Sequence, residues 1–441
     1  MTAQTVAPSP EHIVDATQAG GHHGVNPGEM AIGVIIGRTS EYFDFFVYAI
    51  ASVVVFPKLV FAHYDPLTAM LLSFGVFALA FLVRPLGTAV FTRVELGYGR
   101  ATKLTVALFL LGCSTVALAF LPGYDQIGAT SIVLLIVFRL GQGVALGGTW
   151  DGLPSLLAVN APHNRRGWYA MIPQLGAPIG LLVSAALFAY FLSVLSAQDF
   201  LGWGWRYPFF VAFAINVVAL FSRLRIVSAP EYTEAFQSQD LQPSPVGDTL
   251  RTEGHNVVIG AFAPLASFTL FHTVTVFPLS WVFLYTRQSP AWFLIIEAIG
   301  AVIGIFAVLA SGWLADRTGR RTVLGVTAAA IAAFSGFAPQ LLGSGEVGEA
   351  IFVFLGFALL GLSFGQCSGA IAPSFAMRYR YTGSSLTSDL AWLVGAGFAP
   401  LVALALASRF GLIAAGGYLL SGAIITLVAL AINRQLEAQD R

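Results

Sequence analysis

The chain has 441 residues, of which 57% are hydrophobic and 10% are charged. Soluble domains carry roughly 25% charged residues, because most of their exterior faces water. The composition therefore excludes an ordinary soluble protein and predicts an all-α integral membrane protein whose outer surface is covered by lipid.

The charge balance and the cysteines exclude further classes. The 22 basic residues equal the 22 acidic residues in number, whereas a nucleic-acid-binding protein needs a basic excess. Cys113 and Cys367, the two cysteines of the sequence, both lie in apolar runs. We therefore expect no nucleic-acid partner, no disulfide framework and no structural zinc site.

Twelve apolar runs follow a polar start. Residues 1–29 lack Lys and Arg and do not resemble a signal peptide, so we expect a disordered tail. A helix needs roughly 20 mainly apolar residues to cross the hydrocarbon core, and the runs lack the alternating pattern of a barrel strand. The expected transmembrane helices are residues 30–57, 66–92, 101–122, 128–151, 168–192, 206–225, 256–285, 291–314, 322–343, 349–373, 385–408 and 412–432.

The basic residues predict the orientation. An even number of spans puts both termini on one side, and Lys and Arg are enriched in cytoplasmic loops. The side of the termini carries many basic residues, whereas the opposite side has only Lys58, Arg206, Arg287 and Arg409. We therefore expect both termini in the cytoplasm of a plasma or inner membrane.

The chain divides into two similar halves. A polar stretch, residues 226–255, separates an expected six-helix bundle at 30–225 from a second bundle at 256–433, which a tail at 434–441 follows. Gly99-Arg100 recurs as Gly319-Arg320 and Gly141-Gln142 as Gly365-Gln366, at a nearly constant offset that indicates duplication. Two parallel repeats with a solute site between them are typical of secondary transporters.

Several longer motifs carry a resemblance to a known family. They are Gly37-x-x-x-Glu41-Tyr42-Phe43-Asp44-Phe45, Arg84-Pro85-Leu86-Gly87, Arg139-x-x-Gln142-Gly143, Gly204-Trp205-Arg206-Tyr207-Pro208-Phe209, Gly312-x-x-x-Asp316-Arg317-x-Gly319-Arg320-Arg321 and Arg380-Tyr381-Thr382-Gly383. With them the chain resembles the major facilitator superfamily over about residues 35–435. Within it, the chain looks most like the metabolite:proton symporters that handle shikimate, 2-oxoglutarate, citrate, proline and betaine. The resemblance implies twelve helices in two pseudo-symmetric bundles and alternating access.

The sequence also departs from the family pattern. In the loop after span two, the usual Gly, Asp and Arg are replaced by Thr92, Leu96 and Gly97. In span four the family's usual Glu after Gly-Gly is replaced by Thr149, and the usual Glu before the next loop is replaced by Asn160. These departures predict altered gating and altered proton coupling.

Charged residues within a span are costly and indicate function. Span one has Arg38, Glu41 and Asp44, spaced three apart, so that Arg38 can pair with Glu41. Glu41 or Asp44 is a candidate to carry a proton with the solute. The alternative is a fixed ion-pair cluster that holds span one against its neighbours.

Spans four and seven supply further candidates. Arg139, near Gln142, suits a carboxylate solute because a guanidinium donates two parallel hydrogen bonds, and the resemblance implies a role in coupling or binding. The alternative is a permanent salt bridge from Arg139 to an acid of span one. Asp151 either replaces the missing Glu or ends span four, and His272 either binds solute or packs among aromatic residues.

Two more acids lie within spans of the second half. Glu297 lies in the outer part of span eight, and Asp389 lies near the inner start of span eleven, where the family usually has Asn. Each of them either lines water or anchors a helix end.

The loop after span eight is a candidate latch. The resemblance implies that Asp316 there contacts a helix end and basic residues, and that the contact breaks when the halves rock. The candidate gating residues are Asp316, Arg317, Gly319, Arg320 and Arg321, with Glu95 and Arg100 in the equivalent first-half loop. Because that loop lacks the aspartate, we expect a weaker first-half latch in which Glu95 substitutes in part.

The sequence shows no catalytic or ATP-binding motif. We therefore expect a monomeric, proton-coupled symporter that moves a small polar or anionic metabolite without a cofactor and is not an enzyme. An antiporter or exporter of the same fold and a non-transporting membrane sensor are the alternatives.

Overall fold

The computed structural model describes residues 27–150, 152–154, 157, 161–228, 237, 242–367 and 375–432. Every regular element in these ranges is a helix. The expected tails at 1–29 and 434–441 lie outside the described residues, except for residues 27–29, which begin the first helix. Of the expected linker at 226–255, residues 226–228, 237 and 242–255 are described, and the last part is helical from Val246 onward.

The first half contains six long helical segments. They are joined by the short helices α3 (Phe56–Leu59), α6 (Tyr124–Ile127) and η1 (His163–Arg165). The long segments are α2 (Pro27–Val54), α4 (Pro66–Tyr98), α5 (Arg100–Ala119), α7 (Thr130–Gly148), the series α9 (Arg166–Met171), η2 (Ile172–Leu175) and α10 (Gly176–Val194), and the series α11 (Ala197–Asp199), η3 (Phe200–Gly204) and α12 (Arg206–Val227).

The second half repeats this arrangement. Its first span is interrupted at Pro264 and before Pro278, since proline lacks the N–H that a helix interior needs. The segments are α14 (Val246–Phe262), α15 (Leu265–Thr275), α16 (Phe277–Tyr285), α17 (Pro290–Thr318), α18 (Arg320–Leu341), α19 (Glu346–Phe364), the series η5 (Met377–Tyr379), α20 (Arg380–Ala391), η6 (Trp392–Gly397) and α21 (Ala399–Phe410), and α22 (Leu412–Ile432).

The expected twelve spans are confirmed. Eleven helices of the described chain are long and apolar enough to cross a membrane. The twelfth is α2, a 28-residue helix that differs from the others in carrying Arg38, Glu41 and Asp44 close together. Its length suffices to cross a hydrocarbon core about 30 Å thick.

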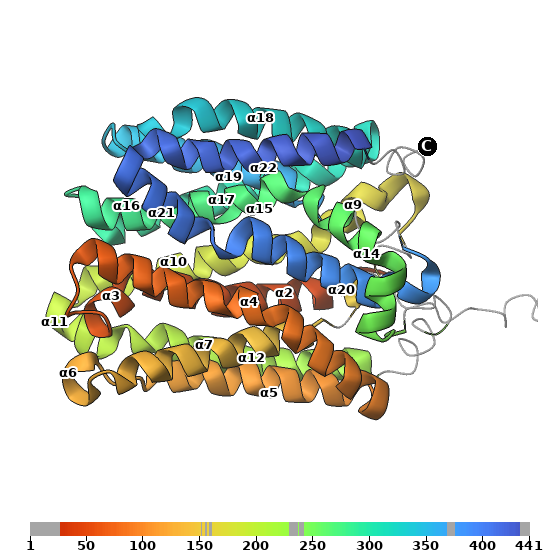
Figure 1. Cartoon of the computed structure of the whole chain (residues 1–441), viewed down its shortest axis with the longest axis horizontal. Coiled ribbons are helices and arrows are strands. Elements are labelled where there is room, and N and C mark those ends of the chain that lie inside the picture. Colours follow the sequence, from red (N-terminus) through yellow and green to blue (C-terminus); the bar gives the residue numbers. More distant parts are fainter. Residues whose placement is uncertain are drawn as a thin grey trace, which may run out of the picture.

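The two halves lie side by side, and the interface between them runs parallel to the long axis of the molecule (Figure 1). Helices α5, α7 and α12 lie on one outer side, and α18, α19 and α22 lie on the other. Between them, α10 packs against α17, and α4 packs against α20, η6 and α21. We call the two ends of the bundle the α14 end and the α3 end, after the helices located there.

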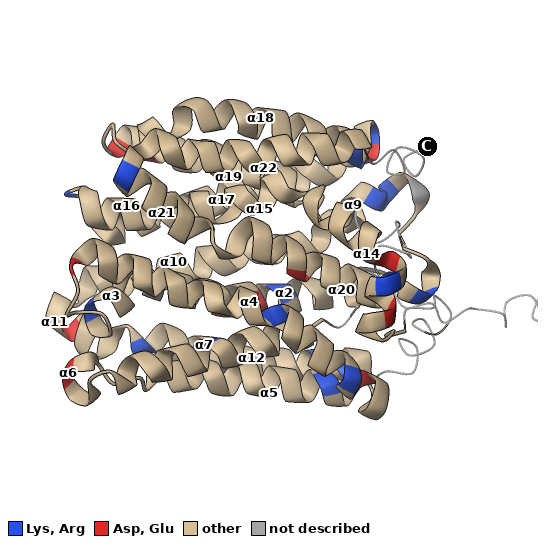
Figure 2. Cartoon of the chain, viewed as in Figure 1, with Lys and Arg blue, Asp and Glu red and all other residues tan. Residues whose placement is uncertain are grey.

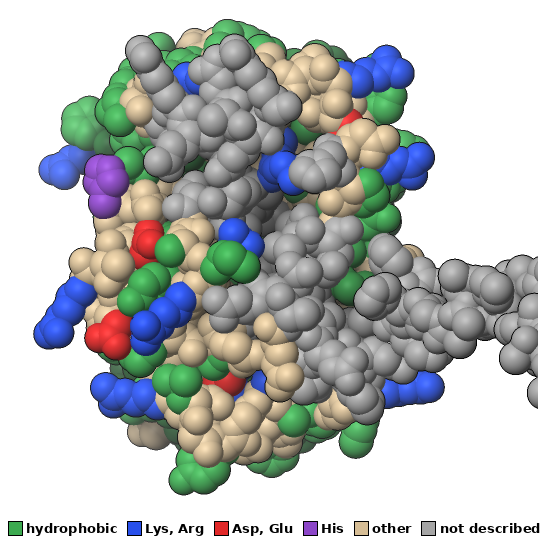
Figure 3. Space-filling model, turned by 90° about the vertical axis from the view of Figure 1, so that its right-hand side faces the viewer, with side chains coloured by type: hydrophobic (Ala, Val, Ile, Leu, Met, Phe, Trp, Pro, Cys, Tyr) green, Lys and Arg blue, Asp and Glu red, His purple; other side chains and the backbone are tan. Residues whose placement is uncertain are grey.

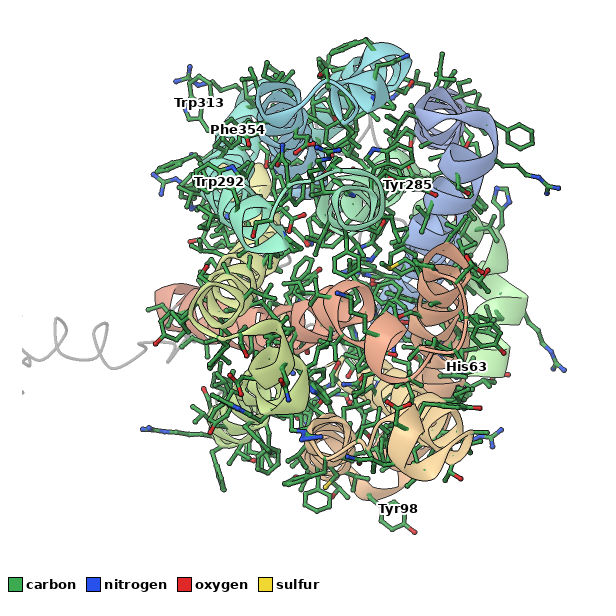
Figure 4. All side chains as sticks on the ribbon, turned by 90° about the vertical axis from the view of Figure 1, so that its left-hand side faces the viewer. His63, Tyr98, Tyr285, Trp292, Trp313 and Phe354 are labelled. Carbon is green, nitrogen blue, oxygen red and sulfur yellow. The ribbon has the colours of Figure 1, made fainter. Side chains whose placement is uncertain are left out.

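The outer surface is apolar, as lipid requires. Phe109, Phe221 and Phe306 are each about two-thirds exposed, at 66%, 68% and 66%. In water such a surface would favour aggregation, whereas acyl chains solvate it. Trp292 and Trp313 point outward from the bundle (Figure 4), in the manner of aromatic residues that contact a bilayer.

Charged residues gather at the two ends of the bundle, and only a few lie between them along the chain (Figure 2). Lys and Arg side chains surround the face at the α14 end (Figure 3). Exposed basic residues there are Arg93, Arg165, Arg225, Arg251, Arg317 and Arg378. The placement of this end in the cytoplasm stays a prediction.

The repeat is visible in the backbone. Gly99, between α4 and α5, has φ 84°, and Gly319, between α17 and α18, has φ 83°. Both turns need this left-handed region, which residues other than glycine rarely adopt. The duplicated Gly-Arg pair therefore builds the same turn in each half.

Candidate transport site

Aromatic rings from both halves meet at the centre of the molecule. The ring of Phe45 lies 5.2 Å from that of His272 and 6.1 Å from that of Trp392. Phe81 stacks on Trp392 at 6.0 Å. We call this buried set the aromatic centre; it consists of Tyr42, Phe45, Phe46, Phe77, Phe81, Phe268, Phe271, His272, Phe364 and Trp392.

A cavity of about 20 Å³ lies beside the aromatic centre, among α10, α15, α17 and α19, and has room for about one water molecule. Its lining is almost entirely apolar and includes Phe46, Pro178, Phe271 and Gly304.

His272 is fully buried in the aromatic centre. Its Nδ1 lies 3.4 Å from Thr275 Oγ1, and its Nε2 has no hydrogen-bond partner among the described residues. The ring packs among aromatic side chains, which was one of the two alternatives for His272. Binding of a solute by this nitrogen stays a prediction.

Asp44 belongs to a chain of hydrogen bonds inside the first half. Its carboxylate accepts hydrogen bonds from Thr115 Oγ1 at 2.5 Å and from Asn216 Nδ2 at 3.2 Å. Gln142 in turn donates to Thr115 at 2.9 Å. In the described chain no basic side chain lies within 4.0 Å of Asp44, so its partners are neutral donors.

Arg139 lies at the other end of this chain of bonds. Its guanidinium donates to the Phe77 carbonyl at 3.0 and 3.2 Å and to Gln142 Oε1 at 3.1 Å. It also lies 3.8 Å above the ring of Tyr48. The alternative of a direct salt bridge to a span-one acid is not formed, because Gln142 and Thr115 separate Arg139 from Asp44.

Glu41 has the opposite environment. Its carboxylate pairs with Arg38 at 2.8 Å, as expected, and with Arg223 of α12 at 2.7 Å. This is the fixed cluster that holds span one against a neighbour. Glu41 and Asp44 share one side of α2, yet Glu41 meets two cations and Asp44 meets none.

Asp389 connects the two halves. Its carboxylate pairs with Arg84 of α4 at 2.8 Å and accepts a hydrogen bond from Thr88 at 2.5 Å. The Asp389 side chain is only 2% exposed, and that of Arg84 is 14% exposed. Asp389 was expected either to line water or to anchor a helix end. The geometry matches the anchor, since the pair with Arg84 joins α20 to α4 of the other half.

We expect Asp389→Asn to destabilise the protein by about 3 kcal/mol, since it leaves a buried cation without its counter-ion. The midpoint of thermal unfolding in detergent measures the effect. The double variant Arg84→Met/Asp389→Leu should recover much of the loss, because apolar residues can replace a buried pair. Equal destabilisation of both variants would contradict this assignment.

Asp316 closes the α14 end between the halves. It lies near the end of α17 and accepts hydrogen bonds from the backbone N–H of Gly167 at 2.6 Å and of Trp168 at 3.2 Å, in the first turn of α9. A carboxylate at a helix N-terminus also interacts favourably with the helix dipole. A side chain at Gly167 would collide with Ala315, so the close approach requires glycine there.

The basic residues beside Asp316 have separate partners. Arg317 lies 3.9 Å from the ring of Trp313, on the outer surface. Arg321 donates to the carbonyl of Leu430 at 2.9 Å and so joins α18 to α22. Arg320 is buried at the start of α18. At this point Gln366 also joins the halves, because its Nε2 donates to the carbonyl of Gly167 at 3.3 Å.

Glu95 forms the equivalent contact in the first half. Its carboxylate bonds Arg100 at 3.0 Å and Lys103 at 2.6 Å. It also accepts from the hydroxyl of Tyr381, on α20 of the second half, at 3.0 Å. Lys103 donates to the same hydroxyl at 2.9 Å. Glu95 thus reaches the opposite half although the family's aspartate is missing.

We expect Tyr381→Phe to favour opening of the α14 end. Removing one charge-assisted hydrogen bond should shift the closed-to-open equilibrium about tenfold. Alkylation of the buried Cys367 in a Cys113→Ala background reports this opening. Unchanged alkylation in both Tyr381→Phe and Glu95→Gln would show that this contact does not hold the end closed.

Comparison with known proteins places the chain in a family. The sequence model of the family described as Major Facilitator Superfamily matches residues 43–400. The chain belongs to the major facilitator superfamily. It is accordingly a membrane transporter and not an enzyme, as the sequence predicted.

Individual major facilitator relatives cover nearly the whole chain. It is 36% identical to the inner membrane metabolite transport protein YhjE of Escherichia coli (strain K12), over 93% of this chain and 95% of the relative. It is 29% identical to the shikimate transporter of the same organism, over 90% and 92%. The solved D-xylose-proton symporter shares the fold, with a TM-score of 0.71 and 17% identity over 90% of this chain and 96% of that one.

In this major facilitator chain, four of the eight residues expected to bind solute or protons lie in two places. Asp44, Arg139 and Gln142 lie in one hydrogen-bonded chain, and His272 lies in the aromatic centre. Asp151 lies outside the described residues.

The sequence prediction missed several partners, of which Thr115, Asn216, Arg223 and Lys103 matter most. A polar residue in an apolar span is a signal in itself. Asn216 and Arg223, seven residues apart on one face of α12, could have been found by that signal.

Proposed function

We propose that this chain is a proton-coupled symporter that takes up a small polar or anionic metabolite by alternating access. It would act as a monomer in the plasma or inner membrane, with both termini and the α14 end in the cytoplasm. The basic residues at the α14 end support this orientation. Relatives named as metabolite, shikimate and proline/betaine transporters support the solute class.

The observation that carries the proposal is the environment of Asp44. A buried carboxyl with two neutral donors and no adjacent cation can gain or lose a proton without breaking an ion pair. The chain of bonds through Thr115 and Gln142 links it to Arg139, which lies beside Phe77 of the aromatic centre. Protonation of Asp44 can therefore influence the packing around a solute.

The solute would bind at the aromatic centre. Rings from both halves would separate around it, His272 Nε2 would supply a hydrogen bond, and apolar faces would cover the rest of its surface. A small ring-shaped or zwitterionic solute suits such a site, because ring faces attract both apolar surface and cations.

The latches would control access. With Asp316 on α9 and Glu95 on Tyr381, the α14 end is closed. Opening it breaks both contacts together with the pair Arg84–Asp389, which also crosses the halves. Rocking of two rigid bundles about the centre is the motion that such contacts favour.

Flux measurements in proteoliposomes test the proposal. Labelled shikimate, 2-oxoglutarate, proline and glycine betaine are offered with an imposed pH gradient. A symporter accumulates its solute on the side toward which protons flow. Accumulation on the opposite side would indicate an antiporter, and flux no higher than in empty vesicles for all solutes would contradict transport of this class.

A further inference from the structure

Glu297 is a buried acid that the proposed mechanism does not use. It lies on α17 and is 0% exposed. Neither of its carboxyl oxygens has a hydrogen-bond partner among the described residues, and none of the ion pairs there includes it. Buried polar groups in proteins are almost always partnered, so this exception needs a reason.

The position of Glu297 relates it to the solute path. Gly304 and Val308, which follow it by 7 and 11 residues, line the small cavity beside the aromatic centre. Those spacings are close to two and three helical turns, so all three residues lie on one face of α17. Glu297 therefore lies on the inward face, about 10 Å along the axis from Gly304, in the direction of α16 and the α3 end.

No neighbouring element offers a cation at that depth. The elements packed against α17 are α9, η2, α10, α16, α18 and α19. In the first half, α10 carries only Tyr190 as a titratable group, η2 carries none, and α9 carries Arg166 and Tyr169 at the α14 end. In the second half, α16 carries only Tyr285, α18 carries only Arg320 and Arg321 at the α14 end, and α19 carries two acids, Glu346 and Glu349.

An ionised carboxylate in such surroundings is very costly, since it has lost water and gained neither a donor nor a cation. The same group as a neutral acid costs far less. Glutamine would fill the same space without any ionisable group. A glutamate here is therefore best explained by reversible binding of a proton.

We propose that Glu297 is a second proton-binding site on the solute path, in the opposite half from Asp44. The inference rests on the proposed proton-coupled transport. In the closed structure the carboxyl holds its proton as an O–H bond. When the path opens and water reaches the side chain, that bond breaks and the proton passes to water, leaving a hydrated carboxylate. The transporter would then move two protons in each cycle.

Infrared spectroscopy of the purified protein in lipid vesicles tests the site directly. At neutral pH the wild-type protein should show the carbonyl band of a protonated carboxylic acid, and Glu297→Gln should lack the part of that band that belongs to this residue. The exposed Glu346→Gln is the matched control and should leave the band unchanged. Glu297→Asp should keep an acid band, which separates loss of the acid from misfolding. Identical spectra of the wild type and Glu297→Gln would overturn the proposal.

Flux measurements separate this inference from the proposed function. With labelled shikimate as the probe, Glu297→Gln should lower accumulation driven by a pH gradient about tenfold and keep solute counterflow within about twofold of wild type. Undiminished accumulation would overturn the role in coupling. If shikimate does not cross in the wild-type protein, the infrared comparison still decides whether Glu297 binds a proton.

Discussion

Replacing Asp44 by asparagine should abolish accumulation of the solute against its gradient while leaving exchange of solute across the membrane. The asparagine oxygen can still accept hydrogen bonds from Thr115 and Asn216, so the local packing should survive. The side chain can no longer take up or release a proton. If Asp44 carries the coupled proton, uptake driven by a pH gradient should fall at least about tenfold.

The measurement compares two assays on the same vesicles, namely uptake driven by an imposed pH gradient and counterflow without one. Asp125→Asn, on the exposed surface of α6, is the matched control and should retain both activities. Loss of both in Asp44→Asn would indicate a structural role. Wild-type accumulation would remove Asp44 from the coupling step and leave Glu297 as the remaining candidate.

Replacing Arg139 should have an equally large effect for a different reason. The guanidinium satisfies the Phe77 carbonyl and Gln142 at once and also covers the ring of Tyr48. A lysine has a compact charge and cannot reproduce this planar set of donors. We therefore expect Arg139→Lys and Arg139→Gln both to lower uptake at least about tenfold, with unchanged amounts of protein in the membrane.

The exposed Arg409→Gln serves as the control, because it removes the same charge from a site without buried partners. Comparing the two Arg139 variants adds information. If Arg139→Lys retains uptake and Arg139→Gln does not, the charge matters and the planar geometry does not. Wild-type uptake in both variants would remove Arg139 from the site.

The sequence by itself determined the class of protein and the number of its spans. Hydropathy is a local property, since each helix in a bilayer must satisfy its own backbone and present apolar side chains over about 20 residues. The paired turns at Gly99 and Gly319 were likewise readable, because a left-handed turn demands glycine wherever it occurs. Asp316 could be singled out because its motif is contiguous in the sequence. In the structure, its carboxylate contacts the N-terminal end of α9.

Only the tertiary structure decided which buried charges have partners. Asp389 and Thr88 are separated by 301 residues, and Glu95 and Tyr381 by 286. The spacing of three residues predicts the pair Arg38–Glu41, but nothing local indicates that Arg223 also meets Glu41 or that Asp44, one turn further on, meets no arginine. The interaction of a side chain in a helix bundle depends on the neighbouring side chain across the helix interface. That neighbour is set by which helices pack together, and hydropathy does not show this.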